Sequence, residues 1–396
     1  MDDMNELYYQ NPYLKEFDAC VTGCAPSEKG YEITLNRTAF YPEGGGQLGD
    51  SGTIGMVAVT DTRRRDGVIV HCTDAPLPAG TEVRCKIDWQ KRFDHMQGHS
   101  GEHMVSGLVR RHYGLDNVGF HMSPDGVTVD FNGVLTDSQL EALEQEVNDF
   151  IYADLPVSVA FPSSEELKSM DYRSKKELSG KVRIVTFPGA DVCACCGTHV
   201  ARTGEVGLIK FISMSRYKSG VRIEMLCGRL ALRDYAVKNK QQQELSRRFS
   251  VKPYELPEAV RQIVAEKEAA EARMSETARK YFALKAAQFP NSDGLVTVFE
   301  EDFRLAEVRK FCDGLVTSGK AQIAGVFVPA ENNGKKGWSY VLCSRNVNMR
   351  EAVKTLNRNL NGRGGGDATL VQGTFFAPQE DIEKTLQELL GSKRAE

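Results

Sequence analysis

Short apolar runs separated by turn residues dominate the first 90 residues of the chain. The runs are YEITLNRTAF, GTIGMVAVTDT, GVIVHC and EVRCKIDW, and stretches rich in Gly, Pro and Asp lie between them. Alternation of apolar and polar positions is typical of β-strands that bury one face. We therefore expect an antiparallel sheet or small β-barrel, forming an N-terminal domain over residues 1–90.

From residue 91 the apolar positions change to helical spacing. The segment HMQGHSGEHMVSGLVRRHY leads to Gly114, a residue suited to a helix C-cap. A second helix is predicted for TDSQLEALEQEVNDFI, where Thr136 and Gln139 have the spacing of a capping box. The pattern then predicts a helix over SSEELKSMDYRSK and strands over VSVAF, VRIVTF, GLIKFIS and VRIEML. We expect an α+β core over residues 91–230.

The remainder of the chain divides into a helical part and a mixed part. Residues 231–288 are rich in Ala, Glu, Lys, Arg and Gln and are interrupted mainly near Pro253 and Pro257, which predicts an extended helical arm or hairpin. Beyond the arm, the strand patterns LVTVF, IAGVFV and WSYVLCS alternate with helical patterns such as MREAVKTLNRNL. This alternation predicts a compact α/β domain over residues 289–396.

Length, composition and charge restrict the function classes. A chain of 396 residues predicts two or three domains, and 41% hydrophobic with 26% charged residues excludes disorder as the main state. The 50 basic residues face 54 acidic ones, for a net charge of -4. Overall charge therefore excludes general attraction to nucleic acid, and any RNA contact must be local.

The sequence gives no sign of a membrane protein. No apolar run approaches the roughly 20 residues that cross a bilayer. The N-terminal segment MDDMNELYYQ is acidic and polar, whereas a signal peptide begins basic and continues apolar. We expect a cytoplasmic protein without membrane contact.

Four residues have the types and the spacing of a zinc site. His99 and His103 stand four residues apart in the predicted helix, so both imidazoles project from one face. Cys195 and His199 repeat this interval in CCGTH. Three imidazoles and one thiolate are ligands that zinc prefers, so the sequence predicts a Zn²⁺ ion bound by these four side chains.

Neighbouring residues leave alternatives open at this site. Cys193 and Cys196 are alternatives to Cys195, although the interval to His199 favours Cys195. His95 continues the helical periodicity about 6 Å further along the axis, and we expect it to support the ligands or to lie at the surface. Four protein ligands are typical of a structural zinc, whereas a catalytic zinc keeps a position for water or substrate. The spacing does not decide between the two.

The segment FYPEGGGQLGDSG is a second candidate for function. Gly44, Gly45 and Gly46 allow backbone conformations closed to other residues and a close approach by a partner, and Gln47 follows them directly. A simple hairpin needs fewer glycines, so we favour a functional loop. No GKS or GKT follows, which excludes a P-loop.

Basic residues mark possible phosphate contacts. Near the C-terminus, Arg358 and Arg363 precede a run of three glycines, Gly364, Gly365 and Gly366, which we expect to form a flexible loop. The guanidinium groups and backbone amides of such a loop can bind phosphate oxygens. A phosphate-tracking surface is also predicted from scattered basic residues, each of which has a solvated face as its alternative. These residues are Arg63, Arg64, Arg65, Lys91, Arg92, Arg110, Arg111, Arg173, Lys175 and Lys176.

Several motifs together resemble the editing module of alanyl-tRNA synthetases and the free-standing alanyl-tRNA editing proteins. The motifs are RTAFYPEGGGQLGDSG, HSGEH, GFHMSPDGVTVDF, ADVCACCGTHVARTGEVGLIKF and GRGGGDATLVQG, in the family order and over nearly the whole chain. The long form of the free-standing proteins fits best. It implies an N-terminal barrel, a zinc editing core, a helical arm and a C-terminal domain shared with DHH phosphoesterases, which contributes to nucleic-acid binding.

The resemblance also implies roles for single residues. His99, His103, Cys195 and His199 correspond to the zinc ligands, and the glycine loop lies near the aminoacyl end. Asn117 occupies nearly the sequence position of a polar residue that faces the substrate in the synthetases. The synthetases have a small and then an aliphatic residue shortly after this position, whereas this chain has Phe120 and His121. No aminoacylation domain has a counterpart, so no ATP-dependent ligation is implied. FDHMQ lacks the acidic metal-binding set of the phosphoesterases.

The expected reaction is zinc-dependent hydrolysis of mischarged tRNA(Ala). Ser-tRNA(Ala) is the main expected substrate, and Gly-tRNA(Ala) is the second. Thr38, Gln47 and Asn117 are candidates for contact with the serine hydroxyl. One alternative is a non-catalytic tRNA- or RNA-binding protein with a structural zinc. Another is an aminoacyl-ester hydrolase acting on further tRNAs. A homodimer through the C-terminal region is compatible with the long arm.

Overall fold

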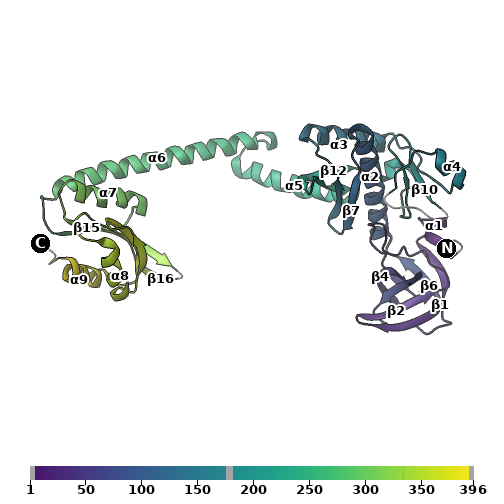
Figure 1. Cartoon of the computed structure of the whole chain (residues 1–396), viewed down its shortest axis with the longest axis horizontal. Coiled ribbons are helices and arrows are strands. Elements are labelled where there is room, and N and C mark those ends of the chain that lie inside the picture. Colours follow the sequence, from purple (N-terminus) through teal and green to yellow (C-terminus); the bar gives the residue numbers. More distant parts are fainter. Residues whose placement is uncertain (1–4, 175–181, 333, 392–396) are drawn as a thin grey trace. The chain divides into compact units, whose positions relative to one another are not determined.

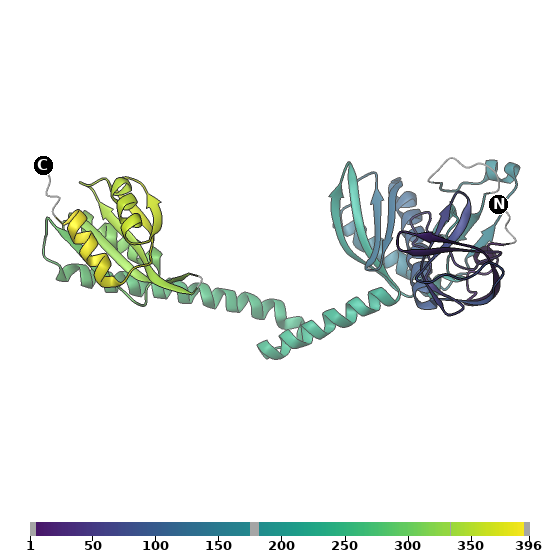
Figure 2. The same cartoon turned by 90° about the horizontal axis from the view of Figure 1, so that it is seen from below.

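A computed structural model describes residues 5–174, 182–332 and 334–391 of the chain. By its internal contacts the chain divides into two compact units, Met1–Glu244 and Leu245–Glu396. Both mix helices and strands (Figures 1 and 2), so the α+β prediction is confirmed. The predicted division into four parts is finer than these two units and stays a prediction.

Unit 1 begins with a closed β-barrel that follows the short helix α1 (Leu7–Gln10). Its strands are β1 (Glu16–Ser27), β2 (Gly30–Leu35), β3 (Gly52–Ile54), β4 (Val57–Arg65), β5 (Val68–Thr73) and β6 (Glu82–Ile87), in the antiparallel order β1-β2-β5-β4-β3-β6. Alternate residues of β6 point inward and are buried, namely Val83, Cys85 and Ile87. The barrel predicted from the alternating pattern is therefore confirmed.

The core of unit 1 is built around the helix α2 (Trp89–Tyr113). Asp88 caps its first turn through a bond from Lys91 N, and Gly114 ends it in the left-handed conformation, with φ of 65°. A four-stranded antiparallel sheet of β12 (Ile209–Tyr217), β13 (Gly220–Cys227), β8 (Gly126–Phe131) and β7 (Asn117–Ser123) packs beside it.

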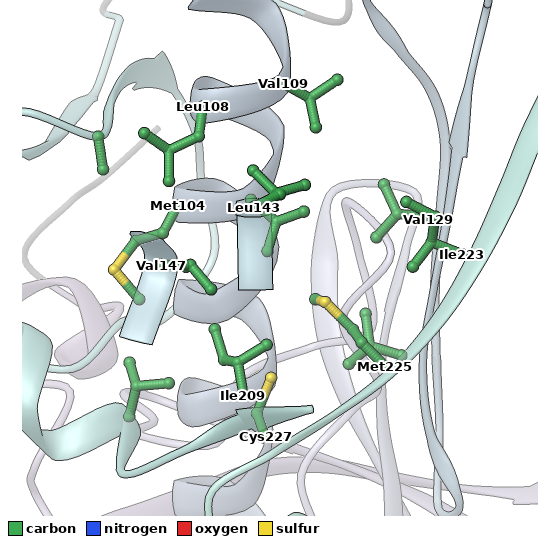
Figure 3. Packing of buried hydrophobic residues seen from close by; sticks show 14 of the residues in the cluster. Met104, Leu108, Val109, Val129, Leu143, Val147, Ile209, Ile223, Met225 and Cys227 are labelled. Atoms are coloured by element: carbon green, nitrogen blue, oxygen red, sulfur yellow. The ribbon is translucent and has the colours of Figure 1, made fainter. Parts of the chain in front are cut away.

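Helix α3 (Asp137–Tyr152) completes this core, and the predicted capping box of Thr136 and Gln139 is present at its start. Apolar side chains of α2, α3 and the sheet meet in one cluster (Figure 3). The cluster includes Met104, Leu108, Leu143, Val147, Val129, Ile223 and Met225. Burial of this apolar surface fixes the position of α2.

A small three-stranded sheet lies against the other side of α2. It has the order β11-β10-β9, from β9 (Ser158–Ala160), β10 (Ile184–Phe187) and β11 (Asp191–Ala194), and the short helix η1 (Thr203–Val206) follows. A Cβ on Gly107 would lie 2.2 Å from Ala190 O, so only glycine allows α2 to approach β11 this closely. The predicted helix over SSEELKSMDYRSK is shorter than expected, because α4 (Ser164–Ser169) ends at residue 169.

Unit 2 contains a five-stranded sheet with the order β14-β15-β16-β18-β17. The strands are β14 (Leu295–Phe299), β15 (Ile323–Asn332), β16 (Lys335–Ser344), β17 (Arg363–Gly366) and β18 (Leu370–Phe375). The helix α7 (Leu305–Thr317) connects the parallel pair β14 and β15 and shares a core with one face, while α8 (Met349–Asn359) and α9 (Gln379–Leu390) share a core with the other. This agrees with the predicted mixed domain.

The glycine run after Arg363 is not the flexible loop that the sequence predicted. Arg363–Gly366 forms β17, the exposed edge strand, and pairs with β18 from Arg363 opposite Thr374 to Gly366 opposite Val371. Strand pairing uses backbone groups, so residues without side chains can take part in it.

Long helices occupy the segment between the sheets. They are α5 (Arg229–Phe249) and α6 (Leu256–Gln288), separated by the single turn η2 (Pro253–Glu255). The interruption predicted near Pro253 and Pro257 is present, because α5 ends at Phe249 and α6 begins at Leu256. Pro257 lies in the first turn of α6, where a missing N–H costs no hydrogen bond. In the described part of the chain, none of the helices is long and apolar enough to cross a membrane.

A buried ion pair joins the barrel to α2. The side chains of Arg92 and Asp50 are 0% and 1% exposed, and Arg92 Nε donates to both carboxylate oxygens at 2.9 and 3.0 Å. Arg92 Nη1 also donates to Pro12 O at 2.9 Å, and Asp50 accepts from Tyr41 N at 2.6 Å. Arg92 therefore has no part in the predicted phosphate-tracking surface.

We predict that Asp50→Asn lowers the free energy of unfolding by about 3–5 kcal/mol, because it leaves the buried Arg92 guanidinium without its counter-charge. Asp18→Asn is the matched control, since Asp18 pairs with Arg84 at 3.0 Å but both side chains are more than half exposed; it should have little effect. Urea unfolding followed by circular dichroism measures both. Equal effects of the two substitutions would contradict the role given to this pair.

Candidate metal centre

The structure brings together the four side chains that the sequence predicted as metal ligands. His99 and His103 project from α2, and Cys195 and His199 lie in the loop after β11. One potential ligand atom from each residue lies within 4.8 Å of the other three. Cys195 Sγ is 3.5 Å from His99 Nε2 and 3.4 Å from His199 Nε2.

These separations fit a single metal ion. Zinc–sulfur and zinc–nitrogen bonds of about 2.3 and 2.05 Å in a tetrahedral site set the two ligand atoms about 3.6 Å apart. The observed sulfur–nitrogen distances of 3.4 and 3.5 Å are close to this value. Three imidazoles with one thiolate also form a donor set suited to zinc. The cluster is thus a candidate metal centre, and the identity of the metal stays a prediction.

His103 is oriented by a buried acid–base network. Its Nδ1 donates to Asp191 Oδ2 at 2.8 Å, which directs Nε2 toward the cluster. Arg173 in turn holds Asp191 through two bonds of 3.0 and 2.8 Å. Arg173 is 6% exposed, so it also lies outside any phosphate-tracking surface. A carboxylate on the far nitrogen of a ligand imidazole fixes its tautomer and raises its basicity.

The other two imidazoles are also fixed through Nδ1. His99 Nδ1 donates to Gln47 Oε1 at 2.9 Å, and His199 Nδ1 lies 3.4 Å from Ser100 Oγ. Gln47 is fully buried; its Oε1 also accepts from Thr198 N at 3.1 Å, and its Nε2 donates to Thr198 Oγ1 at 2.8 Å. Gln47 thus connects the glycine loop, α2 and the Cys195 loop.

The local charges favour a deprotonated sulfur beside a neutral imidazole. Burial alone would raise the pKa of the Cys195 thiol, but the three neighbouring imidazoles lower it well below its ordinary value. Burial lowers the pKa of His199 to about 3. Burial opposes protonation of His103 as well, yet the Cys195 sulfur and Asp191 raise its pKa well above the ordinary value. A thiolate and neutral imidazoles are the forms that bind metals, and binding releases any remaining proton.

The structure favours Cys195 over Cys193 and Cys196 as the cysteine ligand of the cluster. Cys193 is buried and belongs to a second group of potential ligands with His103 and Asp191, but both carboxylate oxygens of Asp191 are already bonded to Arg173. Cys196 is exposed. All ten cysteines are free thiols.

His95 does not lie at the surface, and that part of its expectation is wrong. The residue is 6% exposed, and its Nδ1 has no hydrogen-bond partner among the described residues. It lines a cavity of about 390 Å³ together with Gly98, Met122 and Val127. Burial lowers its pKa to about 4, so the imidazole is neutral at pH 7.

The glycine loop contacts β7 beside the cluster. Gly45 and Gly46 have φ of 61° and 88°, and a Cβ on Gly46 would lie 2.3 Å from the Phe120 ring. Gly46 O accepts from Met122 N at 3.2 Å. The ring of Phe120 stacks on His99 with a centroid distance of 5.0 Å. Glycine is therefore required where the loop meets the strand that covers His99.

Two further candidates for substrate contact already have partners within the protein. Thr38 lies in the barrel unit, where its Oγ1 is 2.9 Å from His71 Nε2 and accepts from Phe40 N. Asn117 Nδ2 donates to Ser106 Oγ at 2.8 Å and to Glu102 Oε1. The hydrogen bonds of Asn117 thus point to Glu102, the residue before His103.

Sequence reasoning missed Glu102, Asp191 and the role of Arg173. Of these three residues, only Glu102 has a signal in the sequence. It is a charged residue between the two ligand histidines of HSGEH, among residues that are otherwise apolar or small. Asp191 precedes the cysteines by two residues without a recognisable spacing. The role of Arg173 is visible only in the folded structure, where it is bonded to Asp191.

Arg358 and the glycine run are in unit 2, in α8 and β17, and residues Arg363 to Gly366 are exposed. Of the other basic candidates, Arg64 pairs with Glu6 at 2.9 Å. Lys175 and Lys176 lie outside the described residues.

Comparison with known proteins connects this geometry to a family. The family model for the second additional domain of threonyl and alanyl tRNA synthetases matches residues 182–224, and the one for class II (A) tRNA synthetases matches residues 13–91. Alanyl-tRNA editing protein AlaX-L from Pyrococcus horikoshii is 30% identical, over 98% of this chain and 99% of its own length. The chain belongs to the alanyl-tRNA editing proteins. As a member of this family it is an aminoacyl-tRNA deacylase, a hydrolase of ester bonds.

Other relatives cover parts of their own length. Alanyl-tRNA editing protein Aarsd1 from Danio rerio is 34% identical over 52% of this chain and 54% of that protein. An alanine–tRNA ligase from Pyrococcus abyssi is 29% identical over 97% of this chain but only 43% of the ligase. Among solved structures, the C-Ala domain of the Aquifex aeolicus alanyl-tRNA synthetase matches 24% of this chain and 89% of that domain, with 27% identity and a TM-score of 0.20.

We predict that Asp191→Asn weakens zinc binding about 10- to 100-fold, because an amide supports the His103 imidazole less than a carboxylate does. Competition with a chromogenic chelator measures the affinity. Asp154→Asn is the control, since Asp154 also pairs with an arginine, at 2.7 Å, but is half exposed. Should Asp191→Asn fail to fold, Gln47→Ala tests the same principle at His99. Affinity equal to that of the unsubstituted protein in either variant would contradict the supporting role.

Proposed function

We propose that the protein deacylates mischarged tRNA(Ala) in trans by zinc-dependent and ATP-independent ester hydrolysis, with Ser-tRNA(Ala) as its main substrate and Gly-tRNA(Ala) as a second substrate. The observation that carries this proposal is the four-group cluster of His99, His103, Cys195 and His199 in a chain of the alanyl-tRNA editing family. The reaction would take place in the cytoplasm, where tRNA is charged.

The chemistry of the amino acids explains the need for such an enzyme. Serine differs from alanine by one hydroxyl group. An aminoacylation pocket cannot strongly reject a near-isostere that only adds a hydroxyl, so a second, hydrolytic site has to remove the error.

A bound zinc ion would polarise the ester carbonyl and favour attack by water. The residues of the chain hold and orient the ligands: Asp191 fixes His103, and Gln47 fixes His99. Cys195 is the one partly exposed member of the ligand set, whereas the three histidines are buried. We infer that the aminoacyl end of the tRNA approaches from the Cys195 side, between the glycine loop and the cysteine loop.

The contacts of Thr38 and Gln47 support positioning roles rather than direct substrate contact. Both side chains have their polar atoms bonded to buried partners of the protein. The glycine loop, Gly44 to Gly46, would shape the entrance beside Phe120, and Asn117 would act through Glu102.

For the tRNA body we propose local contacts in unit 2. Arg358 and the exposed strand from Arg363 to Gly366 offer guanidinium groups and an open backbone edge on a protein of net charge -4. We also propose that the four predicted parts, from barrel to C-terminal domain, act as separate modules, and that copies of the chain pair through the C-terminal region.

The full set of four protein ligands is also typical of a structural zinc. The non-catalytic tRNA- or RNA-binding protein that the sequence left open is not favoured, because the chain belongs to a family of aminoacyl-tRNA deacylases. Removal of the metal separates the two roles of zinc: loss of deacylation with an intact fold supports a catalytic zinc, whereas unfolding of the protein supports a structural one.

We predict that Cys195→Ala lowers the rate of Ser-tRNA(Ala) deacylation about 100-fold or more, because it removes the thiolate from the metal site. The measurement is release of labelled serine, together with zinc content. Cys20→Ser is the control, since this cysteine is partly exposed in the barrel and should keep both zinc and activity. A Cys195→Ala protein with full zinc content and full activity would refute the ligand assignment.

We predict that Arg358→Ala and Arg363→Ala each raise KM for Ser-tRNA(Ala) and leave kcat nearly unchanged, because phosphate contacts contribute to binding but not to chemistry. Each loss should also reduce the slope of log affinity against log salt by about one. Filter binding at several salt concentrations measures the slope. Lys384→Ala, on α9, serves as a control for loss of a positive charge. Slopes identical to those of the unsubstituted chain would argue against tRNA contact at these residues.

A further inference from the structure

A cavity of about 390 Å³ lies beside α2, one helical turn before the predicted metal ligand His99. Buried residues of α2 and of the strands β7, β8 and β13 form its floor, namely His95, Gly98, Met122, Val127 and Cys227. More exposed residues form its rim, among them Asp88, Gln90, Lys91, Pro124 and Arg233. The volume is typical of a site for a small ligand or for one group of a larger ligand.

The floor contains a buried imidazole that makes no hydrogen bond. His95 is 6% exposed, and its two ring nitrogens have no partner in the described part of the chain. Of these nitrogens only Nδ1 is closed to solvent, so Nε2 is the one that a ligand in the cavity can reach. Buried polar groups are nearly always paired, and one that is not calls for an explanation. A ligand with a hydrogen-bonding group provides it.

The rest of the floor is apolar. A Cβ on Gly98 would lie 2.9 Å from Met122 Cε and 3.1 Å from Val127 Cγ2, so α2 comes close to the sheet here. An aliphatic ligand would leave His95 without a hydrogen bond, and a fully polar ligand would lose its water against Met122, Val127 and Cys227. A flat ring with hydrogen-bonding groups at its edge avoids both costs.

Two cations at the rim are free to bind an anion. Lys91 and Arg233 form no ion pair with any residue that the structure describes. The acidic residues of the rim are engaged elsewhere. Asp94 accepts from Arg229 at 2.5 and 3.2 Å, and Asp88 accepts from the backbone N of Lys91 as the cap of α2. The rim therefore favours a ligand with a negative group beside its ring.

A flat ring with a polar edge and a neighbouring anion together describe a nucleotide. Proteins recognise unpaired RNA bases by taking them out of the stack and bonding to their edges. The phosphates between the bases bind lysine and arginine side chains. A tRNA offers such bases next to its aminoacyl group, because its 3′ segment is single-stranded.

One RNA strand can reach both the cavity and the metal centre. His95 and His99 are one turn apart on α2, which is about 6 Å along the helix axis. The glycine loop lies between the two sites, since Met122 N in the cavity floor donates to Gly46 O at 3.2 Å. Gly45 in this loop is exposed, and a Cβ there would meet no atom within 4 Å. A strand can therefore pass over the loop close to its backbone.

We propose that the cavity binds an unpaired base from the 3′ segment of the tRNA, with His95 Nε2 on the edge of the base and Lys91 and Arg233 on the adjoining phosphate. This inference rests on the proposed function, since it adds a contact for the tRNA whose aminoacyl end enters the metal centre. The base lies upstream of the terminal adenosine, because the glycine loop separates the cavity from the cluster. The site recognises the strand and takes no part in the chemistry.

The test uses unacylated tRNA(Ala) in which each nucleotide of the 3′ segment is in turn made abasic, which removes the base and keeps the phosphate. Filter binding gives the affinities of the full-length, zinc-loaded protein and of His95→Phe, which replaces both ring nitrogens by carbon. We expect one abasic position upstream of the terminal adenosine to lower the affinity of the unsubstituted protein about tenfold. His95→Phe should bind the intact tRNA about tenfold more weakly, and the same abasic position should then have little further effect.

The rim is tested by variants that leave the core unchanged. Lys91→Ala and Arg233→Ala alter side chains that are at least partly exposed, and each should reduce the slope of log affinity against log salt by about one. These two variants and the abasic tRNAs decide the question if His95→Phe does not fold. Zinc content and melting temperature are measured for every variant.

Two matched controls should leave the affinity for tRNA nearly unchanged. His112→Phe replaces another imidazole of α2, which pairs with Glu146 at 2.9 Å and is partly exposed. Lys29→Ala removes an exposed positive charge in the turn between β1 and β2.

The outcomes separate this inference from the proposed function. The inference is overturned if no abasic position weakens binding, or if the loss is equal in the unsubstituted protein and in folded His95→Phe. Binding of free AMP or CMP that depends on His95, with an unchanged affinity for tRNA, also overturns it and indicates a site for free nucleotides. Because all of these measurements use unacylated tRNA, a protein that binds as expected but releases no serine from Ser-tRNA(Ala) refutes the proposed function alone.

Discussion

Two segments far apart in the sequence meet at one point because buried polar side chains hold them there. The bond between His103 on α2 and Asp191 on β11 is the main connection, and Arg173 secures the carboxylate from the other side. Each of these groups would be costly to bury alone. Together they compensate one another, and as a result three imidazoles and a thiolate face a common centre.

The same principle operates where the barrel joins the core. Asp50 follows the glycine loop and is bonded to the fully buried Arg92 at the start of α2. Gln47, three residues earlier, reaches His99 and the backbone of the cysteine loop. The barrel domain therefore contributes directly to the metal centre. Its glycine loop orients His99 and contacts β7, the strand whose Phe120 covers His99. A deacylase needs such preorganisation, because small displacements of catalytic groups cost much of their effect.

The sequence could predict those features that depend on local periodicity. The barrel strands follow from alternation, α2 and α3 from apolar spacing and caps, and the four ligand candidates from two intervals of four residues. The network behind the ligands could not be predicted, because it joins α2 to Asp191, Arg173 and Asn117, which come from segments that meet only after folding. The strand Arg363–Gly366 could not be predicted for a different reason. It pairs through its backbone, and its glycines show no alternation of apolar and polar side chains.

X-ray absorption at the zinc edge of the purified protein tests the central claim most directly. A metal held by His99, His103, Cys195 and His199 predicts one sulfur neighbour at about 2.3 Å and nitrogen neighbours at about 2.0–2.1 Å, at one zinc per chain. The sulfur signal should disappear in Cys195→Ala. Two or more sulfur neighbours, or a sulfur signal that survives this substitution, would contradict the account.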